Sequence, residues 1–138
     1  CENILAQTFV KPGMVVPMNY HFTTTKAHIV LNGGTIEEII SSKGLEVVSV
    51  EPFKGDMDVS KLQAIVEQRG AEKIAFVRME AGTNLVGGQP FSLENLYAVR
   101  KVADQHKLLL VLDASQNGQR DFVCSMCQKN LWFGEPLR

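Results

Sequence analysis

Helical and strand-like hydrophobic patterns alternate through the second half of the chain. Asp58 precedes apolar residues at helical spacing and Gly70 follows them, which predicts a capped helix. Residues 74–80 read as a strand, and Ser92 begins a second helix with one apolar face. That helix leads to residues 108–112, an uninterrupted apolar run typical of a strand buried on both faces in a parallel sheet. The alternation predicts an α/β fold in three layers, with helices crossing over a mainly parallel sheet.

Turn signals divide the first half of the chain into shorter elements. Pro17 lies within an apolar segment and indicates a sheet edge or the start of a strand. The threonine hydroxyls of residues 23–25 suit a helix N-terminus, and Asn32-Gly33-Gly34 suits the end of that helix. The predicted elements are the end of a helix within 1–9, a strand over 14–20, a short helix through 26–31 that follows the threonines, and strands over 35–40 and 45–50.

Composition places the chain among ordinary globular proteins. It has 138 residues, 45% of them hydrophobic and 21% charged, with a net charge of −1. This length fits about one domain, and the lack of a long basic run argues against nucleic acid or a membrane surface as a partner. Three cysteines do not make a secreted disulfide framework, so we expect a cytoplasmic protein. Because the chain opens on Cys1 rather than Met, we also expect it to be a piece of a longer protein.

Three predicted strand ends carry side chains that could meet in one crevice. They are Phe22, Asn84 and Asp113, and ligands of open α/β sheets bind beyond the carboxyl ends of the strands. An aromatic face, an amide and a carboxylate suit a flat heteroaromatic ring with a nitrogen and an oxygen, such as pyridoxal phosphate. The alternative is structural, with a core Phe22, a turn residue Asn84 and a helix-capping Asp113.

The remaining motifs point less directly to chemistry. Gly87-Gly88 could cradle a phosphate, but it lacks the spacing of the known phosphate motifs and suits a tight turn better. The three histidines share no ligand spacing, so they predict no metal site. Cys124-x-x-Cys127 could be half of a zinc site or a redox pair, although no second ligand pair follows it.

Four motifs follow one another along the chain. They are Met18-Asn19-Tyr20-His21-Phe22-Thr23-Thr24-Thr25-Lys26, Pro52-Phe53-Lys54-Gly55-Asp56-Met57-Asp58, Asn84-Leu85-Val86-Gly87-Gly88-Gln89-Pro90 and Asp113-Ala114-Ser115. In this order and spacing they resemble the motifs of the aromatic amino-acid β-eliminating lyases, the family of tyrosine phenol-lyase and tryptophanase. The resemblance covers residues 1–115, which we interpret as part of one large domain, and leaves 116–138 as a divergent C-terminal tail.

This resemblance implies a fold, a cofactor and a reaction. The fold is the aspartate-aminotransferase-like large domain of pyridoxal phosphate enzymes (fold type I), and the reaction expels phenol or indole from tyrosine or tryptophan, leaving pyruvate and ammonia. By resemblance, Asp113 pairs with the pyridinium nitrogen, Asn84 bonds the ring oxygen and Phe22 stacks on the ring. Thr23 matches a threonine that holds the phenol hydroxyl in phenol-lyases, where tryptophanases usually have Asp, so it favours the phenol-lyase side.

Departures from the family pattern limit what this piece is expected to do. Gln116 stands where the family has an arginine that touches the cofactor oxygen. The family's Schiff-base lysine, phosphate loop, substrate-carboxylate arginine and potassium ligands have no counterpart here, so we expect the piece alone to be inactive. The parent family is a homotetramer that uses a monovalent cation. Two other interpretations are a threonine aldolase-like lyase of fold type I, and a non-catalytic remnant whose tail binds metal through Cys124 and Cys127.

Overall fold

The computed structural model describes residues 1–115. The predictions for Gln116, for Cys124 and Cys127, and for the rest of the tail lie outside the described residues. Within residues 1–115, no helix is long and apolar enough to cross a membrane.

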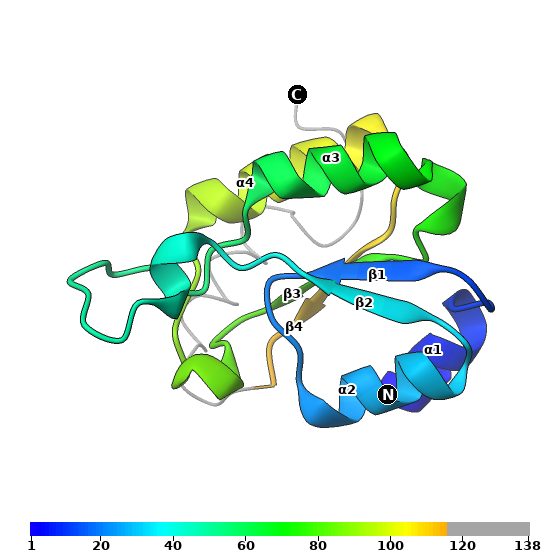
Figure 1. The fold of residues 1–138 in the computed structure, drawn as a ribbon, viewed down its shortest axis with the longest axis horizontal. Helices are drawn as coiled ribbons and strands as arrows, with labels where there is room; N and C mark the ends of the chain where they lie inside the picture. Colours follow the sequence, from blue (N-terminus) through cyan, green and yellow to red (C-terminus); the bar gives the residue numbers. More distant parts are fainter. Residues whose placement is uncertain (116–138) are drawn as a thin grey trace.

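Four parallel strands form the central sheet, in the order β2–β1–β3–β4 (Figure 1). Their bounds are β1 (Val15–Met18), β2 (Thr35–Glu38), β3 (Val77–Glu80) and β4 (Leu110–Asp113). The register between β3 and β4 ends with Glu80 opposite Asp113. Because all the strands run the same way, their carboxyl ends share one edge of the sheet, as the alternating pattern predicted.

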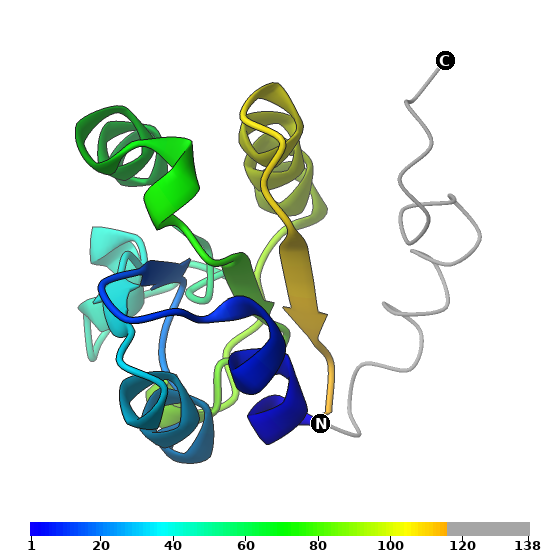
Figure 2. The same ribbon diagram turned by 90° about the vertical axis from the view of Figure 1, so that its right-hand side faces the viewer.

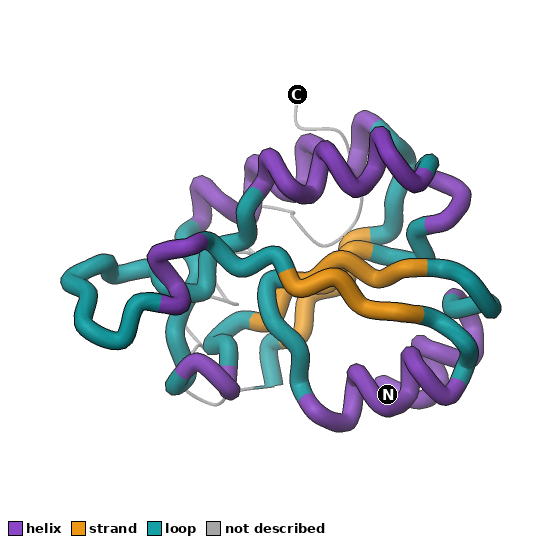
Figure 3. The backbone as a smooth tube through the Cα atoms, in the orientation of Figure 1, coloured by secondary structure: helices purple, strands orange, loops and turns teal. Residues whose placement is uncertain are grey.

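Helices cover both faces of the sheet and complete the predicted three layers. Figure 2 shows one pair of helices on either side of the strands, and Figure 3 shows the same separation along the backbone. One pair is α1 (Glu2–Phe9) and α2 (Thr23–Leu31), and the other is α3 (Val59–Arg69) and α4 (Leu93–Gln105). Three short 3₁₀ helices lie in the connections: η1 (Ser42–Leu45), η2 (Ala71–Lys73) and η3 (Asn84–Val86).

The helix caps of the second half are those expected from the sequence. The Asp58 side chain accepts a hydrogen bond from the Lys61 N–H (3.1 Å), and the Ser92 hydroxyl accepts one from the Asn95 N–H (3.0 Å). Gly70 ends α3 with φ of 83°, a conformation that glycine adopts without strain. The Asp58 and Ser92 side chains each satisfy a backbone donor that the first turn of the helix cannot satisfy.

Strand alternation divides the core between the two faces of the sheet. Val77 and Met79 pack with the cluster under α3 and α4, whereas Phe76 packs with the cluster under α1 and α2. The residues of β3 that share a face with Phe76 are Arg78 and Glu80, since successive strand side chains point to opposite faces. These two charges therefore lie on the α1–α2 side, at the carboxyl edge.

One strand prediction from the sequence is wrong, and the predicted burial of another strand is wrong. Residues 45–50 form no strand: η1 takes the first of them, and Val47, Val48 and Val50 are almost fully exposed. Their β-branched side chains favour extended backbone, but no strand within residues 1–115 pairs with them. Residues 110–112 of the predicted strand 108–112 lie in β4, but they are only half-buried because β4 is the edge strand of the described sheet.

Two finer predictions are also corrected. Pro17 lies in the interior strand β1, not at an edge. Strands β1 and β3 pair only at Val15↔Ile74 and Met18↔Arg78. The N–H that proline lacks therefore falls between these two points of pairing. Helix α2 begins where the threonines predicted, but no hydroxyl caps it, and its N-cap residue is Phe22.

Candidate functional site

A cleft of about 870 Å³ opens at the carboxyl edge of the sheet, on the side covered by α1 and α2. Its walls come from α1, the start of α2 and the ends of β3 and β4. This is the position where open parallel sheets bind ligands, so the fold places a candidate site where the sequence predicted one.

The structure brings three of the predicted site residues together. Phe22 at the start of α2, Asn84 at the start of η3 and Asp113 at the end of β4 all line this cleft. Thr23 is exposed in the first turn of α2 and is not part of the lining, whereas the buried Thr25 is. The roles assigned to these residues by resemblance stay predictions.

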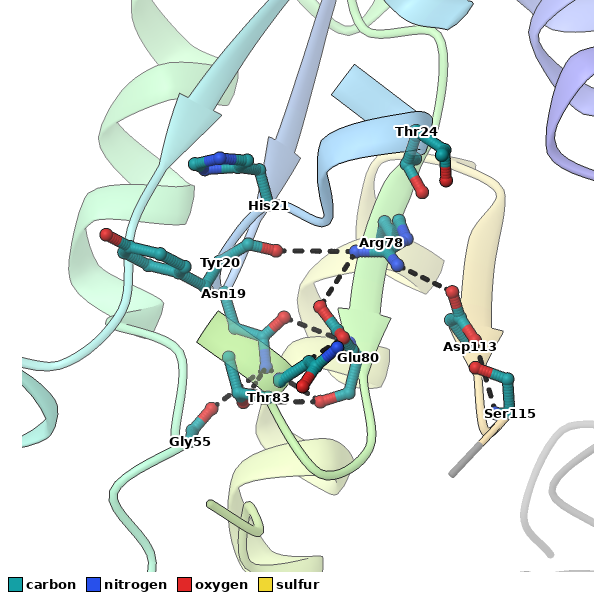
Figure 4. A network of polar contacts seen from close by, with 12 residues as sticks. Asn19, Tyr20, His21, Thr24, Gly55, Arg78, Glu80, Thr83, Asp113 and Ser115 are labelled. Carbon is teal, nitrogen blue, oxygen red and sulfur yellow. Dashed lines mark hydrogen bonds and ion pairs between the residues drawn. The ribbon is translucent and has the colours of Figure 1, made fainter. Parts of the chain in front are cut away.

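Arg78 is a charged residue of the cleft that the sequence analysis did not single out. It lies on β3, and its side chain is only 2% exposed. The guanidinium lies between Tyr20, which follows β1, and Asp113 on β4 (Figure 4). Nη2 donates to Asp113 Oδ2 at 2.6 Å, and Nη1 donates to the Tyr20 carbonyl at 3.3 Å and to Glu80 Oε2 at 3.4 Å. The guanidinium therefore connects both carboxylates of the site to the end of β1.

Glu80 is the most deeply buried carboxylate of this group. It is 4% exposed and lines the cleft beside Arg78 and Asp113. Its Oε1 accepts a hydrogen bond from the Asn84 N–H at 3.3 Å, which attaches Glu80 to the start of η3. A signal for Arg78 and Glu80 is visible in the sequence, because opposite charges two residues apart in a buried strand must share one face.

The two carboxylates respond differently to their surroundings. Burial raises the pKa of Glu80, and this effect exceeds the opposing attraction of Arg78 and the hydrogen bond from Asn84. Burial also acts to raise the pKa of Asp113, but the charge of Arg78 and the hydrogen bonds from Arg78 and Ser115 together lower it. Asp113 is thus held as a carboxylate, while Glu80 is the readier of the two to bind a proton.

Asn19 holds the end of β3 in place beneath this charged group. Its Oδ1 accepts the Glu80 N–H at 2.9 Å, and its Nδ2 donates to the Glu80 carbonyl at 3.0 Å. Nδ2 also donates to the Gly55 carbonyl at 3.0 Å and contacts Thr83 Oγ1 at 3.3 Å. The side-chain amide continues the β1–β3 pairing beyond Met18, and it attaches the Gly55 loop to the same point.

Helix α1 is fixed to the start of α2 by a carboxylate. Glu2 Oε2 accepts from the Thr24 hydroxyl at 2.5 Å, and Oε1 accepts from the Thr25 hydroxyl. The threonine hydroxyls therefore join two helices of the cleft wall and do not cap α2, because Glu2 lies within their reach. At the neighbouring strand end, His21 Nδ1 pairs with Glu38.

The Gly87-Gly88 connection forms a turn. The Gly87 N–H donates to the Asn84 carbonyl and the Gly88 N–H to the Thr83 carbonyl, both at 3.0 Å. These donors are used within the loop, which supports the structural interpretation over a phosphate cradle. Among residues 1–115, no group of three or more His, Cys, Asp or Glu side chains is placed to hold a metal ion.

Solved structures with the same fold are pyridoxal-phosphate-type aminotransferases and lyases. An archaeal alanine:glyoxylate aminotransferase superimposes with a TM-score of 0.63 at 22% identity, covering 80% of this chain and 25% of that one. Cystalysin from Treponema denticola, whose structure contains pyridoxal 5′-phosphate, gives a TM-score of 0.61 at 16% identity, covering 82% and 26%. These likenesses confirm the predicted fold, a fragment of the fold type I large domain.

Sequence comparison identifies the family. The model of the beta-eliminating lyase family matches residues 1–116. Tyrosine phenol-lyase of Fusobacterium nucleatum is 44% identical over 115 residues, and that of Nostoc punctiforme is 41% identical over the same length. Both alignments cover 83% of this chain and 25% of the relative, so the chain spans about a quarter of the length of these proteins. The chain belongs to the beta-eliminating lyase family.

Proposed function

We propose that this chain supplies the ring-binding side of a pyridoxal 5′-phosphate site in an enzyme that eliminates phenol from L-tyrosine, leaving pyruvate and ammonia. The observation that carries the proposal is the convergence of Phe22, Asn84 and Asp113 in one cleft at the carboxyl edge of the sheet. The choice of tyrosine over tryptophan is supported by Thr23 and by the relatives named tyrosine phenol-lyase.

The side chains of the cleft fit this cofactor. Asp113 is an ionised carboxylate at the end of a strand, as a protonated ring nitrogen requires, and Phe22 and Asn84 add an aromatic surface and an amide. When bound, pyridoxal phosphate supplies the electron sink for the bond that breaks at the substrate α-carbon. In this proposal Asp113 holds the ring-nitrogen proton, Asn84 bonds the ring oxygen and Phe22 excludes water from one ring face.

Thr23 is proposed to orient the phenol group from the first turn of α2. Its exposed position at the start of the helix leaves the hydroxyl accessible to a substrate entering from outside the cleft. Thr25 is the less suitable residue because its hydroxyl already donates to Glu2.

We infer that the 138-residue chain does not turn over substrate alone. No lysine among residues 1–115 lines the cleft, so the described part of the chain offers no lysine amine there for a Schiff base with the cofactor. On the family resemblance we also propose that the complete enzyme is a homotetramer that uses a monovalent cation.

A segment exchange tests the proposed activity. Residues 1–115 would replace the matching segment of the Fusobacterium nucleatum tyrosine phenol-lyase, and pyruvate release would be measured with tyrosine and with tryptophan. We expect tyrosine to be the better substrate, and Thr23→Asp to move the preference toward tryptophan. Asp113→Asn should lower kcat at least about a hundredfold in a chimera that stays folded. A folded, cofactor-loaded chimera that releases no pyruvate from either amino acid would refute the proposal.

The 138-residue chain provides a second test that does not depend on turnover. Pyridoxamine 5′-phosphate carries the same ring and needs no lysine, so its binding can be followed by equilibrium dialysis. We expect binding that Asp113→Asn weakens and that Glu38→Gln, a change at the same sheet edge but outside the cleft lining, leaves unchanged.

A further inference from the structure

Arg78, Glu80 and Asp113 form a cluster whose formal charges do not cancel, with Arg78 and Glu80 buried and Asp113 half-buried. One guanidinium faces two carboxylates, at 2.6 Å from Asp113 and 3.4 Å from Glu80. Arg78 is the only basic side chain among the described residues that line the cleft. With both carboxylates ionised, the cluster carries one excess negative charge, which is costly because Arg78 and Glu80 are removed from water.

We propose that Arg78 and Glu80 are a charge-balancing pair for the Asp113 site, in which Glu80 releases a proton to solvent when a protonated ring nitrogen binds Asp113. The inference rests on the proposed function, because it takes a cationic heteroaromatic ring as the ligand. It assigns to β3 a part in cofactor binding that the sequence motifs did not indicate.

The geometry separates the tasks of the two carboxylates. Arg78 binds Asp113 through Oδ2 at 2.6 Å, whereas Oδ1 accepts a longer hydrogen bond from the Ser115 N–H at 3.2 Å. Oδ1 is therefore the oxygen available to a ligand that enters the cleft. Arg78 thus fixes the direction of the carboxylate, which makes it a positioning residue.

The need to keep the cluster electrically neutral then assigns the proton to Glu80. Without a ligand, a protonated Glu80 leaves Arg78 and Asp113 as a neutral pair. When a ring nitrogen brings one positive charge, an ionised Glu80 restores neutrality, so binding and proton release are coupled. Asp113 is less suited to this task because its contact with the guanidinium is the shorter one.

Among the described residues, the other charged side chains that line the cleft with Glu80 are Arg78, Asp113 and, on α1, Glu2, whose carboxylate accepts from the Thr24 and Thr25 hydroxyls. The charged groups that act on Glu80 are Arg78 on the same strand and Asp113 on β4. Its remaining contacts are neutral, namely the Asn84 N–H from η3 and the Asn19 amide from the end of β1, which binds the Glu80 backbone. Burial raises the pKa of Glu80, in keeping with a proton held there before the ring binds.

Carboxyl carbon NMR of the 138-residue chain tests this coupling. Titration curves of Glu80 and Asp113 would be recorded alone, with pyridoxamine 5′-phosphate, and with its analogue in which a carbon replaces the ring nitrogen. The analogue keeps the phosphate and the amine, so the comparison isolates the ring nitrogen. We expect pyridoxamine 5′-phosphate to lower the titration midpoint of Glu80 by about one pH unit or more, and the analogue to leave it unchanged.

The possible outcomes distinguish this inference from the proposed function. Binding of pyridoxamine 5′-phosphate with an unchanged Glu80 midpoint would overturn the charge-balancing pair and leave the cofactor site standing. Absence of binding would overturn the cofactor site and the pair with it. An equal shift with the carbon analogue would also overturn the pair, because the ring nitrogen would then not be the cause.

Variants provide a second readout by calorimetry. Proton release on binding of pyridoxamine 5′-phosphate would be measured in two buffers of different ionisation enthalpy. We expect Glu80→Gln to abolish the release that the ring nitrogen causes, and Glu38→Gln to retain it. Arg78→Lys keeps the charge but not the two-pronged geometry, so it should preserve proton release while binding the ligand about tenfold more weakly. Full proton release by a folded Glu80→Gln variant would contradict the assignment.

Discussion

Replacing Asn19 with alanine should destabilise the fold more than its small size suggests. The side chain is fully buried, and its amide bonds both the N–H and the carbonyl of Glu80 as well as the Gly55 carbonyl. Those Glu80 groups point toward β1, because the β4 side of β3 is paired through the Ala81 N–H and the Asp113 carbonyl. Asn19→Ala therefore leaves them without the partner that β1 would otherwise supply.

The magnitude follows from the number of groups left unpaired. Each buried backbone group that loses its partner costs about 1–3 kcal/mol. The Glu80 N–H loses its acceptor, the Gly55 carbonyl loses a donor, and the Glu80 carbonyl keeps only a long contact with Thr83 Oγ1 at 3.5 Å. Allowing for partial relaxation, we expect a loss of about 3–5 kcal/mol, a large share of the about 5–15 kcal/mol typical of a domain.

Urea unfolding followed by circular dichroism measures this loss, with Asn32→Ala as the matched control. Asn32 Nδ2 makes one bond, to the His28 carbonyl at 2.8 Å, at the half-buried end of α2 where water can replace it. Asn32→Ala should lower the free energy of unfolding by less than about 1 kcal/mol. Equal losses in the two variants would refute the idea that the Asn19 amide substitutes for strand pairing.

Three further substitutions test the stability that comes from the site, from a close contact between two loops and from a helix cap. A fourth substitution serves as a control. The pKa of Asp113 is lower in the folded chain than its ordinary value, so the ionised side chain stabilises the fold when the pH lies above that ordinary value. This stabilisation is lost as the pH falls through the pKa of the folded state. Urea titrations should therefore show wild type more stable than Asp113→Asn at neutral pH, with the gap closing below about pH 4. Gly55→Ala should cost about 1–3 kcal/mol, because its Cβ would lie 2.6 Å from the Gln89 carbonyl oxygen. Asp58→Ala should cost about 1 kcal/mol through its lost cap, and the exposed Val48→Ser should stay within about 0.5 kcal/mol.

Local chemistry explains which elements could be predicted from the sequence. Helices α3 and α4 were predictable because Asp58 and Ser92 cap them and their apolar residues recur at helical spacing. Residues 45–50 were not, because β-branched composition favours a strand only where a neighbouring strand can pair with it, and pairing is a property of the tertiary fold. The degree of burial of 108–112 likewise depends on what lies beyond the sheet edge.

The candidate site was predictable to the extent that it depends on strand ends. Phe22, Asn84 and Asp113 each follow or end a strand, and parallel strands bring such residues to one edge. Thr23 and Thr25 could not be separated this way, since which of them faces the cleft depends on the rotation of α2 against Glu2.

The end of β3 shows how one short strand serves the core and the site together. Val77 and Met79 need only be apolar and of suitable size to pack beneath α3 and α4. Arg78 and Glu80, on the other face, form an ion pair that lines the cleft. In the proposed function their charges must match that of the ligand at Asp113, because a buried excess charge is costly. Substitutions on the two faces are therefore constrained independently. The fold can persist while the electrostatics of the cleft are adjusted through positions 78 and 80 alone.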